Sequence, residues 1–161
     1  SVHDIDIINY LFGLYPKSVY CAGGSYNKNG NEDHVSIFLN YGEGKIGICE
    51  TSWQSPIKIR KLSITSSINY AELDFMNQSI DLSKSKLLDF NDRNFFKQTM
   101  EIENQKINLS REEPLKNQLS DFLNSVKYSS APLVGGADGL SILKVAKATL
   151  ESLKLNKVVK L

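Results

Sequence analysis

A histidine near the start of the chain stands beside two carboxylates, a grouping that could move protons. His3 is followed by Asp4 and, one helical turn on, by Asp6. The amino-terminal end of a helix dipole favours a neutral imidazole, whereas a nearby carboxylate favours the protonated form. A histidine between these influences can serve as an acid or a base near neutral pH. The alternative is that the histidine is only a terminal residue and the carboxylates cap the helix.

A second group of side chains able to do chemistry, Glu32–His34, precedes a predicted strand. With His3 it contains residue types that bind metal ions, but the spacing matches no zinc motif. Neither Cys21 nor Cys49 belongs to a C-x-x-C pair. We therefore expect no metal and interpret Glu32–His34 as the polar start of a strand. A metal-dependent enzyme that uses these residues is the alternative.

A third group combines an aromatic ring with two cations in the segment SWQSPIKIR. Trp53 offers a flat face for stacking, and Lys58 and Arg60 offer donors for a phosphate or carboxylate. If a strand runs from Lys58, both cations share a face with the aliphatic residues that follow, so Arg60 needs a partner there. An anionic ligand and an ion pair with Glu50 or Glu72 remain equal alternatives.

The strands that would position these groups are predicted from an alternation of apolar and polar residues. Period-two alternation broken by short turns, such as Asn27–Asn31, indicates consecutive antiparallel strands with one covered face. The predicted strands begin at Ser18, His34, Lys45, Lys58 and Ala71, and weaker ones lie between 78 and 109 in SIDL, KLLDF and FKQTMEIEN.

Three helices and a short final strand, VVKL, complete the pattern. The first helix spans 3–13, the second is expected to begin at a capping box over 110–113, and the third follows Gly135 and Gly136 with Asp138 as its cap. The second helix should bury Leu115, Leu119, Phe122, Leu123 and Val126, and the third Leu140, Leu143, Ala146, Leu150 and Leu153.

This order of elements predicts an α+β fold in a single domain over residues 1–161. Strands and helices that are segregated along a chain favour an open, largely antiparallel sheet with helices on one face. Three helices are too few to cover both faces. Because a broad apolar face left in water usually marks an interface, we expect a homodimer or homotetramer joined through the sheet face.

Composition excludes several classes of protein. The 161 residues carry 19 basic and 18 acidic side chains, a balance that does not indicate binding to nucleic acid. No window holds the roughly 18 apolar residues needed to cross a membrane, and the amino terminus lacks the basic residues of a secretory signal. We expect Cys21 and Cys49 to be reduced, buried thiols in the cytoplasm. A helix that begins almost at residue 1, without a methionine, suggests a piece of a longer protein.

Several segments together resemble the C-terminal half of the Gfo/Idh/MocA oxidoreductases. The segments, in order, are HDIDIINYLFG, EDHVSIFLNYGEGKIGICETSW, PIKIRKLSI, EEPLKNQLSDFLNSV and APLVGGADGLSILKVAKATLESLK. The resemblance runs from His3 to about Lys154. It implies that a Rossmann domain that binds NAD or NADP precedes this chain in the parent enzyme. The C-terminal half then lines the substrate site and mediates oligomers. No G-x-G-x-x-G segment follows a strand here, so we expect no cofactor-binding residues in this chain.

The resemblance also implies roles for particular residues. The family's helix opener has an aspartate, three residues, a histidine, and an aspartate three further on. His3 and Asp6 match the last two, which implies that His3 is catalytic and that Asp6 supports it. SWQSPIKIRKLSI and AELDFMNQSIDL are similar to the nucleotide-sugar branch, such as UDP-N-acetylglucosamine 3-dehydrogenases, which implies that Trp53, Lys58 and Arg60 bind substrate.

The leading prediction is the substrate-binding and oligomerisation domain of an NAD(P)-dependent oxidoreductase, isolated from its cofactor domain and inactive alone. The expected substrate is a sugar, nucleotide sugar or polyol that is oxidised at a hydroxyl. The alternative is a self-standing binding or scaffold module of the same fold that has lost catalysis.

Overall fold

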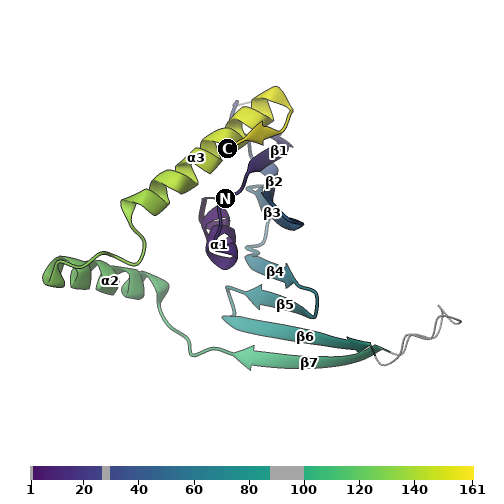
Figure 1. Cartoon of the computed structure of the whole chain (residues 1–161), viewed down its shortest axis with the longest axis vertical. Coiled ribbons are helices and arrows are strands. Elements are labelled where there is room, and N and C mark those ends of the chain that lie inside the picture. Colours follow the sequence, from purple (N-terminus) through teal and green to yellow (C-terminus); the bar gives the residue numbers. More distant parts are fainter. Residues whose placement is uncertain (1, 27–29, 88–99) are drawn as a thin grey trace, which may run out of the picture. The chain divides into compact units, whose positions relative to one another are not determined.

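The computed structural model describes residues 2–26, 30–87 and 100–161, and it confirms the predicted α+β class (Figure 1). These residues gather in two compact units, one formed by 1–56 with 120–161 and the other by 57–119. The sequence predicted one continuous sheet, whereas backbone hydrogen bonds divide the described strands into two four-stranded sheets, one in each unit. The prediction of a single domain stays a prediction.

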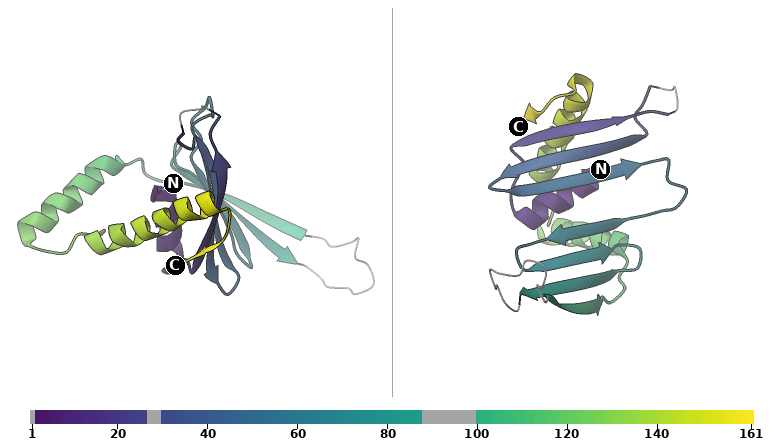
Figure 2. Two further views of the ribbon diagram at one scale, coloured as in Figure 1. Left: turned by 90° about the horizontal axis from the view of Figure 1, so that it is seen from above. Right: turned by 90° about the vertical axis from the view of Figure 1, so that its right-hand side faces the viewer.

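The first unit contains a wholly antiparallel sheet covered by two helices. Its strands run in the spatial order β3-β2-β1-β8. The left view of Figure 2 shows both helices on the same side of these strands. The elements are α1 (Val2–Phe12), β1 (Ser18–Gly24), β2 (His34–Gly42), β3 (Lys45–Ser52), α3 (Gly136–Leu155) and β8 (Val159–Lys160).

The core of this unit lies between the helices and the odd-numbered residues of the strands. Ile37, Leu39 and Tyr41 of β2 are at most 2% exposed, as the alternation predicted. Cys21 and Cys49 pair with Ile37 from either side, and both are free, buried thiols, which confirms the prediction of reduced cysteines. A fully buried aliphatic side chain contributes about 1.5–3 kcal/mol to the free energy of folding, so the buried side chains of β2 and its two neighbours stabilise this sheet.

The opposite face of the same sheet carries apolar side chains that the described helices of this unit do not cover. Phe38 lies directly across from Ile48 in the register of β2 and β3, and Ile46 is next to them. These three side chains are 39%, 63% and 49% exposed, respectively. The predicted bare sheet face is therefore present in this unit.

The helix α3 is covered on a face that only partly matches the predicted stripe, of which Leu153 packs against the core. The expected stripe included Leu140, Leu143 and Leu150, which are 56%, 62% and 52% exposed. The sheet instead contacts Val145, Ala148, Thr149 and Ser152. These smaller side chains let the helix lie close to β1, and the leucines consequently face outward. A helix that is apolar on two opposite sides needs a second covering surface.

Ser152 explains why α3 fits β1 so closely. Its side chain is fully buried, and its hydroxyl accepts a hydrogen bond from the Cys21 N–H (2.9 Å) and donates one to the Lys157 carbonyl (2.6 Å). The short strand β8 pairs only with Ser18 and Val19 of β1. Beyond these residues, the Ser152 hydroxyl accepts the hydrogen bond from the next outward-facing N–H of β1, that of Cys21.

The second unit is a meander of four antiparallel strands in sequential order, β4-β5-β6-β7. The predicted strand from Lys58 begins only at Lys61, so the shared face expected for Lys58 and Arg60 does not arise. SIDL and the end of FKQTMEIEN lie in strands. The end of KLLDF and the start of FKQTMEIEN fall in residues 88–99, which are outside the described part of the chain. Residues 27–29 of the predicted turn are also outside it. The strands are β4 (Lys61–Thr65), β5 (Asn69–Asp74), β6 (Ser79–Leu87) and β7 (Met100–Asn108).

The helix α2 (Pro114–Tyr128) begins at Pro114, so Ser110 is too far upstream to be its N-cap and the predicted capping box is wrong. Proline suits this first position because its missing N–H would be unpaired there anyway. No residue of α2 is buried, although its apolar side chains share one face. None of the helices in the described part of the chain is long and apolar enough to cross a membrane.

Replacing Ser152 with alanine should lower the free energy of unfolding by about 1–3 kcal/mol, because a buried N–H and a carbonyl lose their partner. The measurement is urea denaturation of the two proteins. The matched control is Ser141→Ala on the same helix, whose hydroxyl donates only to the exposed Ala137 carbonyl. That control should change stability by no more than about 0.5 kcal/mol. Equal losses would contradict a special role for Ser152.

Candidate functional site

A hollow of about 460 Å³ opens at one end of the first unit's sheet. It lies where β2 begins and β3 ends, and it combines carboxylates, an imidazole, hydroxyls and an indole ring. Two groups singled out from the sequence, Glu32–His34 and Trp53, are thereby brought together. The lining residues are Glu32, Asp33, His34, Val35, Thr51, Ser52, Trp53 and Leu150.

The buried carboxylate of Asp33 organises this hollow. Asp33 is only 8% exposed. Its carboxylate accepts hydrogen bonds from the Tyr26 N–H (2.8 Å) and the Gln54 Nε2 (3.0 Å), and Oδ1 lies 2.9 Å from His34 Nδ1. Its carbonyl accepts a bond from the Trp53 N–H (2.8 Å). One residue therefore fixes the imidazole and the backbone that carries the indole.

The sequence places Asp33 inward because of strand parity. Asp33 has the same parity as Val35 and Ile37, which face the helices. A carboxylate on that side must find donors, since a buried charge without partners is strongly disfavoured. Tyr26 and Gln54, which supply them, were not among the residues singled out from the sequence. The inward position of Asp33 can be inferred from the alternation in the sequence, and it would have prompted a search for residues that donate to its carboxylate.

The imidazole of His34 is held on two sides. Nδ1 bonds to Asp33, and the ring lies 5.1 Å from the Tyr26 ring, centre to centre. Its side chain is still 40% exposed. In the tautomer whose Nδ1 donates to the carboxylate, Nε2 carries the lone pair and can accept a hydrogen bond from a ligand.

The amino-terminal end of α1, which carries His3, lies toward the same end of β3. Ile8 packs so closely on Gly47 that a Cβ there would approach within 2.9 Å of its Cγ2. Burial first, and then the charge of Asp4, raise the pKa of the Cys49 thiol to about 11. The helix therefore runs from the level of Cys49 toward that of Gly47. Its start therefore lies toward the end of β3, and the right view of Figure 2 shows α1 crossing behind the strands of this sheet.

The other predicted site residues fall in different places. His3 is exposed on the first turn of α1, and Asp6, one turn on, is half-buried and lines a separate hollow. Lys58 and Arg60 belong to the second unit and are exposed. Within the first unit, the structure brings Trp53 together with Glu32–His34.

Arg60 contacts an aromatic ring instead of a carboxylate. Its guanidinium lies 5.3 Å from the centre of the Phe75 ring, and its carbonyl accepts the Phe75 N–H (3.1 Å). The suggested partner Glu72 pairs with Lys61 at 2.7 Å. The hydrogen bond and charge of Lys61 lower the pKa of Glu72, although both groups are at the surface, where such pairs contribute little to stability.

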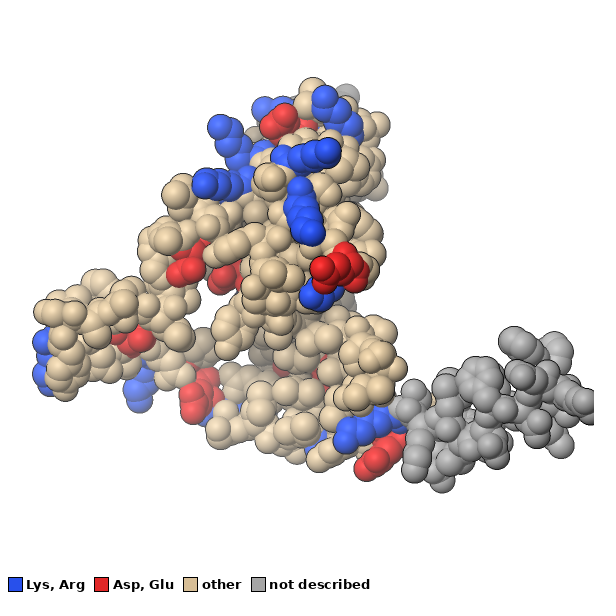
Figure 3. All heavy atoms as spheres, in the orientation of Figure 1, with Lys and Arg blue, Asp and Glu red and all other residues tan. Residues whose placement is uncertain are grey.

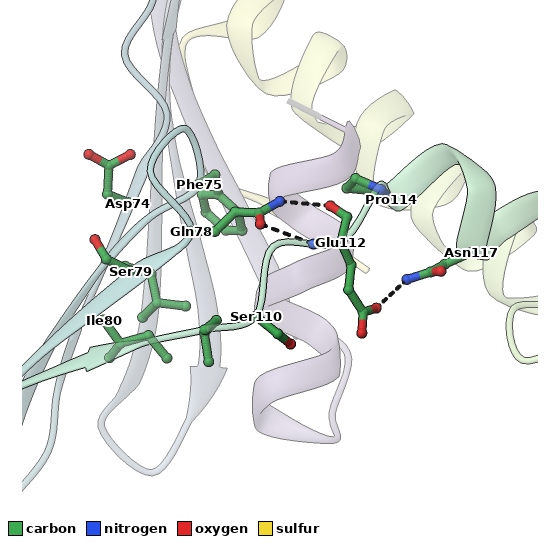
Figure 4. A pocket seen from close by; sticks show the side chains of 11 residues that line it. Asp74, Phe75, Gln78, Ser79, Ile80, Ser110, Glu112, Pro114 and Asn117 are labelled. Atoms are coloured by element: carbon green, nitrogen blue, oxygen red, sulfur yellow. Dashed lines mark hydrogen bonds between the residues drawn. The ribbon is translucent and has the colours of Figure 1, made fainter.

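A second hollow, of about 590 Å³, lies wholly within the second unit and is shown in Figure 4. Gln78 clasps the backbone of Glu112, donating from Nε2 to its carbonyl (3.0 Å) and accepting its N–H (3.3 Å). The Glu112 carboxylate accepts a bond from Asn117 Nδ2 (2.7 Å). Because these polar groups are already paired with one another, the arrangement favours a structural clasp before α2 over a binding site.

A third hollow, of about 290 Å³, borders α1 and the start of α3 and contains Asn9. Asn9 is 7% exposed, and its Oδ1 accepts the Tyr41 hydroxyl at 2.7 Å. Burial raises the pKa of Tyr41, which keeps that hydroxyl a donor. Within residues 2–26, 30–87 and 100–161, no partner is found for the buried Asn9 Nδ2.

Charge is unevenly distributed over the first unit. Figure 3 shows lysine side chains gathered over the part of this unit that holds α3, where few carboxylates accompany them. The helix contributes Lys144, Lys147 and Lys154. The carboxylates of Glu32 and Asp33 in the hollow carry the opposite charge. Anions should therefore be attracted to the lysines over α3 and repelled from the hollow. Among the described residues, no group of three or more histidine, cysteine, aspartate or glutamate side chains could hold a metal ion.

Comparison with known proteins gives a family match for the first part of the chain. Residues 1–67 match the model of the GFO/IDH/MocA C-terminal domain, which confirms the predicted resemblance to this family. A comparison with curated proteins finds no match.

Solved oxidoreductases share the fold at low sequence identity. UDP-N-acetylglucosamine 3-dehydrogenase GnnA from Acidithiobacillus ferrooxidans is 18% identical with a TM-score of 0.79, over 96% of this chain and 46% of that one. Aldose-aldose oxidoreductase from Caulobacter crescentus, complexed with glycerol, is 17% identical with a TM-score of 0.76, over 99% and 45%. An oxidoreductase from Agrobacterium radiobacter in complex with NAD+, L-tartaric acid and magnesium is 17% identical with a TM-score of 0.68, over 99% of this chain and 47% of that one. The chain spans about half the length of these proteins.

The placement of α1 against β3 can be tested through the thiol of Cys49. Its pKa of about 11 exceeds the ordinary value of 9.0, so an unfolded chain releases this proton first. Stability is therefore lost as the pH rises from about 9 to about 11. Replacing Asp4 with asparagine should lower the pKa of Cys49 and shrink that loss. The measurement is a titration of thiolate absorbance and urea denaturation across this range, in a Cys21→Ala background.

The control for this titration is Asp6→Asn, which also removes a carboxylate from α1. Asp6 is not among the charges that raise the pKa of Cys49. An equal effect of both substitutions would refute the proposed course of the helix.

Proposed function

We propose that this chain is the substrate-binding and oligomerisation domain of an NAD(P)-dependent oxidoreductase of the GFO/IDH/MocA type. Its substrate would be a sugar, nucleotide sugar or polyol that is oxidised at a hydroxyl group. The observation that carries the proposal is the match of residues 1–67 to the C-terminal domain of this family. The likeness of nearly the whole chain to about half of several solved oxidoreductases supports it.

The cofactor would be held by another part of a longer protein. Dinucleotides are bound at the turn of a parallel βαβ unit that carries a glycine-rich loop. All pairs among the described strands are antiparallel, so these residues do not fit a dinucleotide. The nicotinamide chemistry therefore belongs to the other part, and this chain supplies substrate contacts and proton transfer. The free, buried cysteines support a cytoplasmic location.

His3 is the proposed acid–base residue. It lies on the exposed first turn of α1, where it is open to a substrate. In the oxidation of an alcohol, the hydroxyl oxygen loses its proton as the carbon becomes a carbonyl, and His3 would accept that proton. Asp6 supports the helix that presents it. Lys58 and Arg60 would contact a diphosphate if the substrate is a nucleotide sugar.

In the intact enzyme, His3→Gln should lower kcat by about 10²–10⁴-fold, because a glutamine cannot accept the substrate proton. Affinity for NADH should be unchanged, since the cofactor is bound elsewhere. Steady-state kinetics with a fluorescence titration of NADH measure both quantities.

Two further results bear on this proposal. Asp6→Asn, the matched control on the same helix, should lower kcat much less than His3→Gln. The 161-residue chain alone should show no saturable NADH fluorescence. Tight NADH binding by the isolated chain, or an unchanged kcat in His3→Gln, would overturn the proposal.

The exposed face of the first sheet is the proposed oligomer interface. Replacing Phe38 with lysine should convert the oligomer to monomers, because it places a charge at the centre of the apolar face. Light scattering coupled to size exclusion gives the mass in solution. Leu133→Lys, at an 85% exposed position in a loop, is the control and should leave the mass unchanged. A wild-type chain that is strictly monomeric would refute the interface.

A further inference from the structure

We propose that the third hollow, which borders α1 and the start of α3, binds a small organic cation. The expected ligand is a primary ammonium group with a neutral hydrogen-bond acceptor beside it and an apolar body. Either a free amine or the amino terminus of a peptide carries such a group. Binding there requires neither a nicotinamide nor His3, so this site goes beyond the proposed function.

One side of α1 forms a wall of this hollow. Asp6, Asn9 and Tyr10 are three and four residues apart, which places them on the same side of the helix, and all three line the hollow. Ile5 and Ile8, which belong to the core, lie on the neighbouring side. The polar side of α1 therefore faces α3, which lies next to it on the same face of the sheet (Figure 2).

Asn9 lies at the border between the core and the hollow. The residue is 7% exposed, and its Oδ1 accepts the Tyr41 hydroxyl at 2.7 Å. Nδ2 is then the polar atom of this amide that is left for an occupant of the hollow, and it has no partner within residues 2–26, 30–87 and 100–161. Because a buried donor without an acceptor is unfavourable, a ligand that brings an oxygen to Nδ2 should bind more tightly.

Carboxylates give the hollow a negative charge. Asp6 and Asp138 both line it, and no lysine, arginine or histidine does so among the described residues. One oxygen of Asp138 accepts the Gly135 N–H (2.8 Å). Beside the hollow, the Asp121 carboxylate accepts the Leu133 N–H (3.2 Å). Like charges that no cation in the lining balances favour a ligand of positive charge.

The carboxyl-terminal end of α1 adds to this charge. The helix ends at Phe12, and Gly13, which also lines the hollow, has the left-handed φ of 61° that ends many helices. The last turn carries no basic residue to offset the partial negative charge of this end. The start of α3 has the opposite partial charge, but Asp138 already lies in its first turn. The two carboxylates and the end of α1 therefore set the sign of the charge that the hollow attracts.

The remaining walls suit an apolar body. Leu14, Val134 and Ile142 line the hollow together with Tyr10 and Tyr15. Tyr10 is 83% exposed and Tyr15 is 54% exposed, so both rings are open to a ligand, and an ammonium over such a ring is attracted to its face. The volume of about 290 Å³ is close to the lower end of the roughly 300–1,000 Å³ of small-molecule sites, which indicates a small ligand.

Calorimetric titration of the 161-residue chain with three related compounds tests the site, at about pH 6.5, where an α-amino group is protonated. Leucinamide carries the ammonium, a neutral carbonyl oxygen and an isobutyl body, and it should bind saturably. Isoamylamine lacks the carbonyl that would accept from Asn9 Nδ2 and should bind about tenfold more weakly. Leucine has a carboxylate in place of the amide and should not bind at the same concentrations, because Asp6 and Asp138 repel it.

Matched substitutions separate the hollow from its surroundings. Asp6→Asn and Asp138→Asn should each raise the Kd for leucinamide about tenfold, because each removes a charge that faces the ammonium. In the second variant, the asparagine keeps an oxygen for the Gly135 N–H. Asp4→Asn is the control, because it removes the same charge from α1 at a residue that does not line the hollow. Its Kd should change by less than about twofold, since solvent and salt screen more distant charges.

A substitution of Asn9 tests the orphan donor. Asn9→Asp keeps an oxygen for the Tyr41 hydroxyl but has no N–H, so it should abolish the preference for leucinamide over isoamylamine. Circular dichroism verifies that this variant is folded. The comparison of the two compounds on the wild type tests the same contact without any substitution.

Several results would overturn the site. These are the absence of saturable heat with leucinamide, equally tight binding of leucine or isoamylamine, and a rise of Kd in Asp4→Asn as large as in Asp6→Asn. The peptide leucyl-glycyl-glycine distinguishes the two sources of the ammonium. Binding at least as tight as that of leucinamide identifies a peptide amino terminus, and weaker binding identifies a free amine. None of these titrations involves turnover, so their outcome is independent of the proposed oxidation.

Discussion

The buried carboxylate of Asp33 is the constraint on which the candidate site depends. A charge on a side chain that is only 10% exposed persists only if hydrogen bonds replace its hydration, and here a backbone N–H, an amide and an imidazole do so. Each donor comes from a different segment, namely the end of β1, the segment after β3 and the start of β2. The three hydrogen bonds to this one carboxylate therefore bring together the three segments that form the hollow.

Much of this arrangement could be predicted from the sequence because alternation is a strong signal for strands. The alternation after His34 puts Ile37, Leu39 and Tyr41 on one face, and the structure buries that face. Glu32–His34 and Trp53 were each singled out. That they line one hollow was not foreseen, because the register between β2 and β3, which pairs His34 with Ser52, is a long-range property.

The errors have physical causes that single residues make clear. In α3, Leu140, Leu143 and Leu150 are larger and more apolar than the buried residues of the helix, so hydrophobicity alone selected these three in error. Close approach to β1 required Ala148 and Ser152 instead. In the second unit, a strand was expected to begin at Lys58. The ladder instead starts where Lys61 can pair with Asp74, which alternation in one strand does not reveal.

Ser152 has a consequence for solubility. The strand β8 is two residues long, so the outer edge of β1 beyond Val19 would otherwise present free backbone groups to any passing strand. Exposed edges of this kind promote aggregation and strand exchange. The serine hydroxyl occupies the Cys21 N–H, and the end of α3 covers the same edge. A helix thus terminates the sheet in place of another strand.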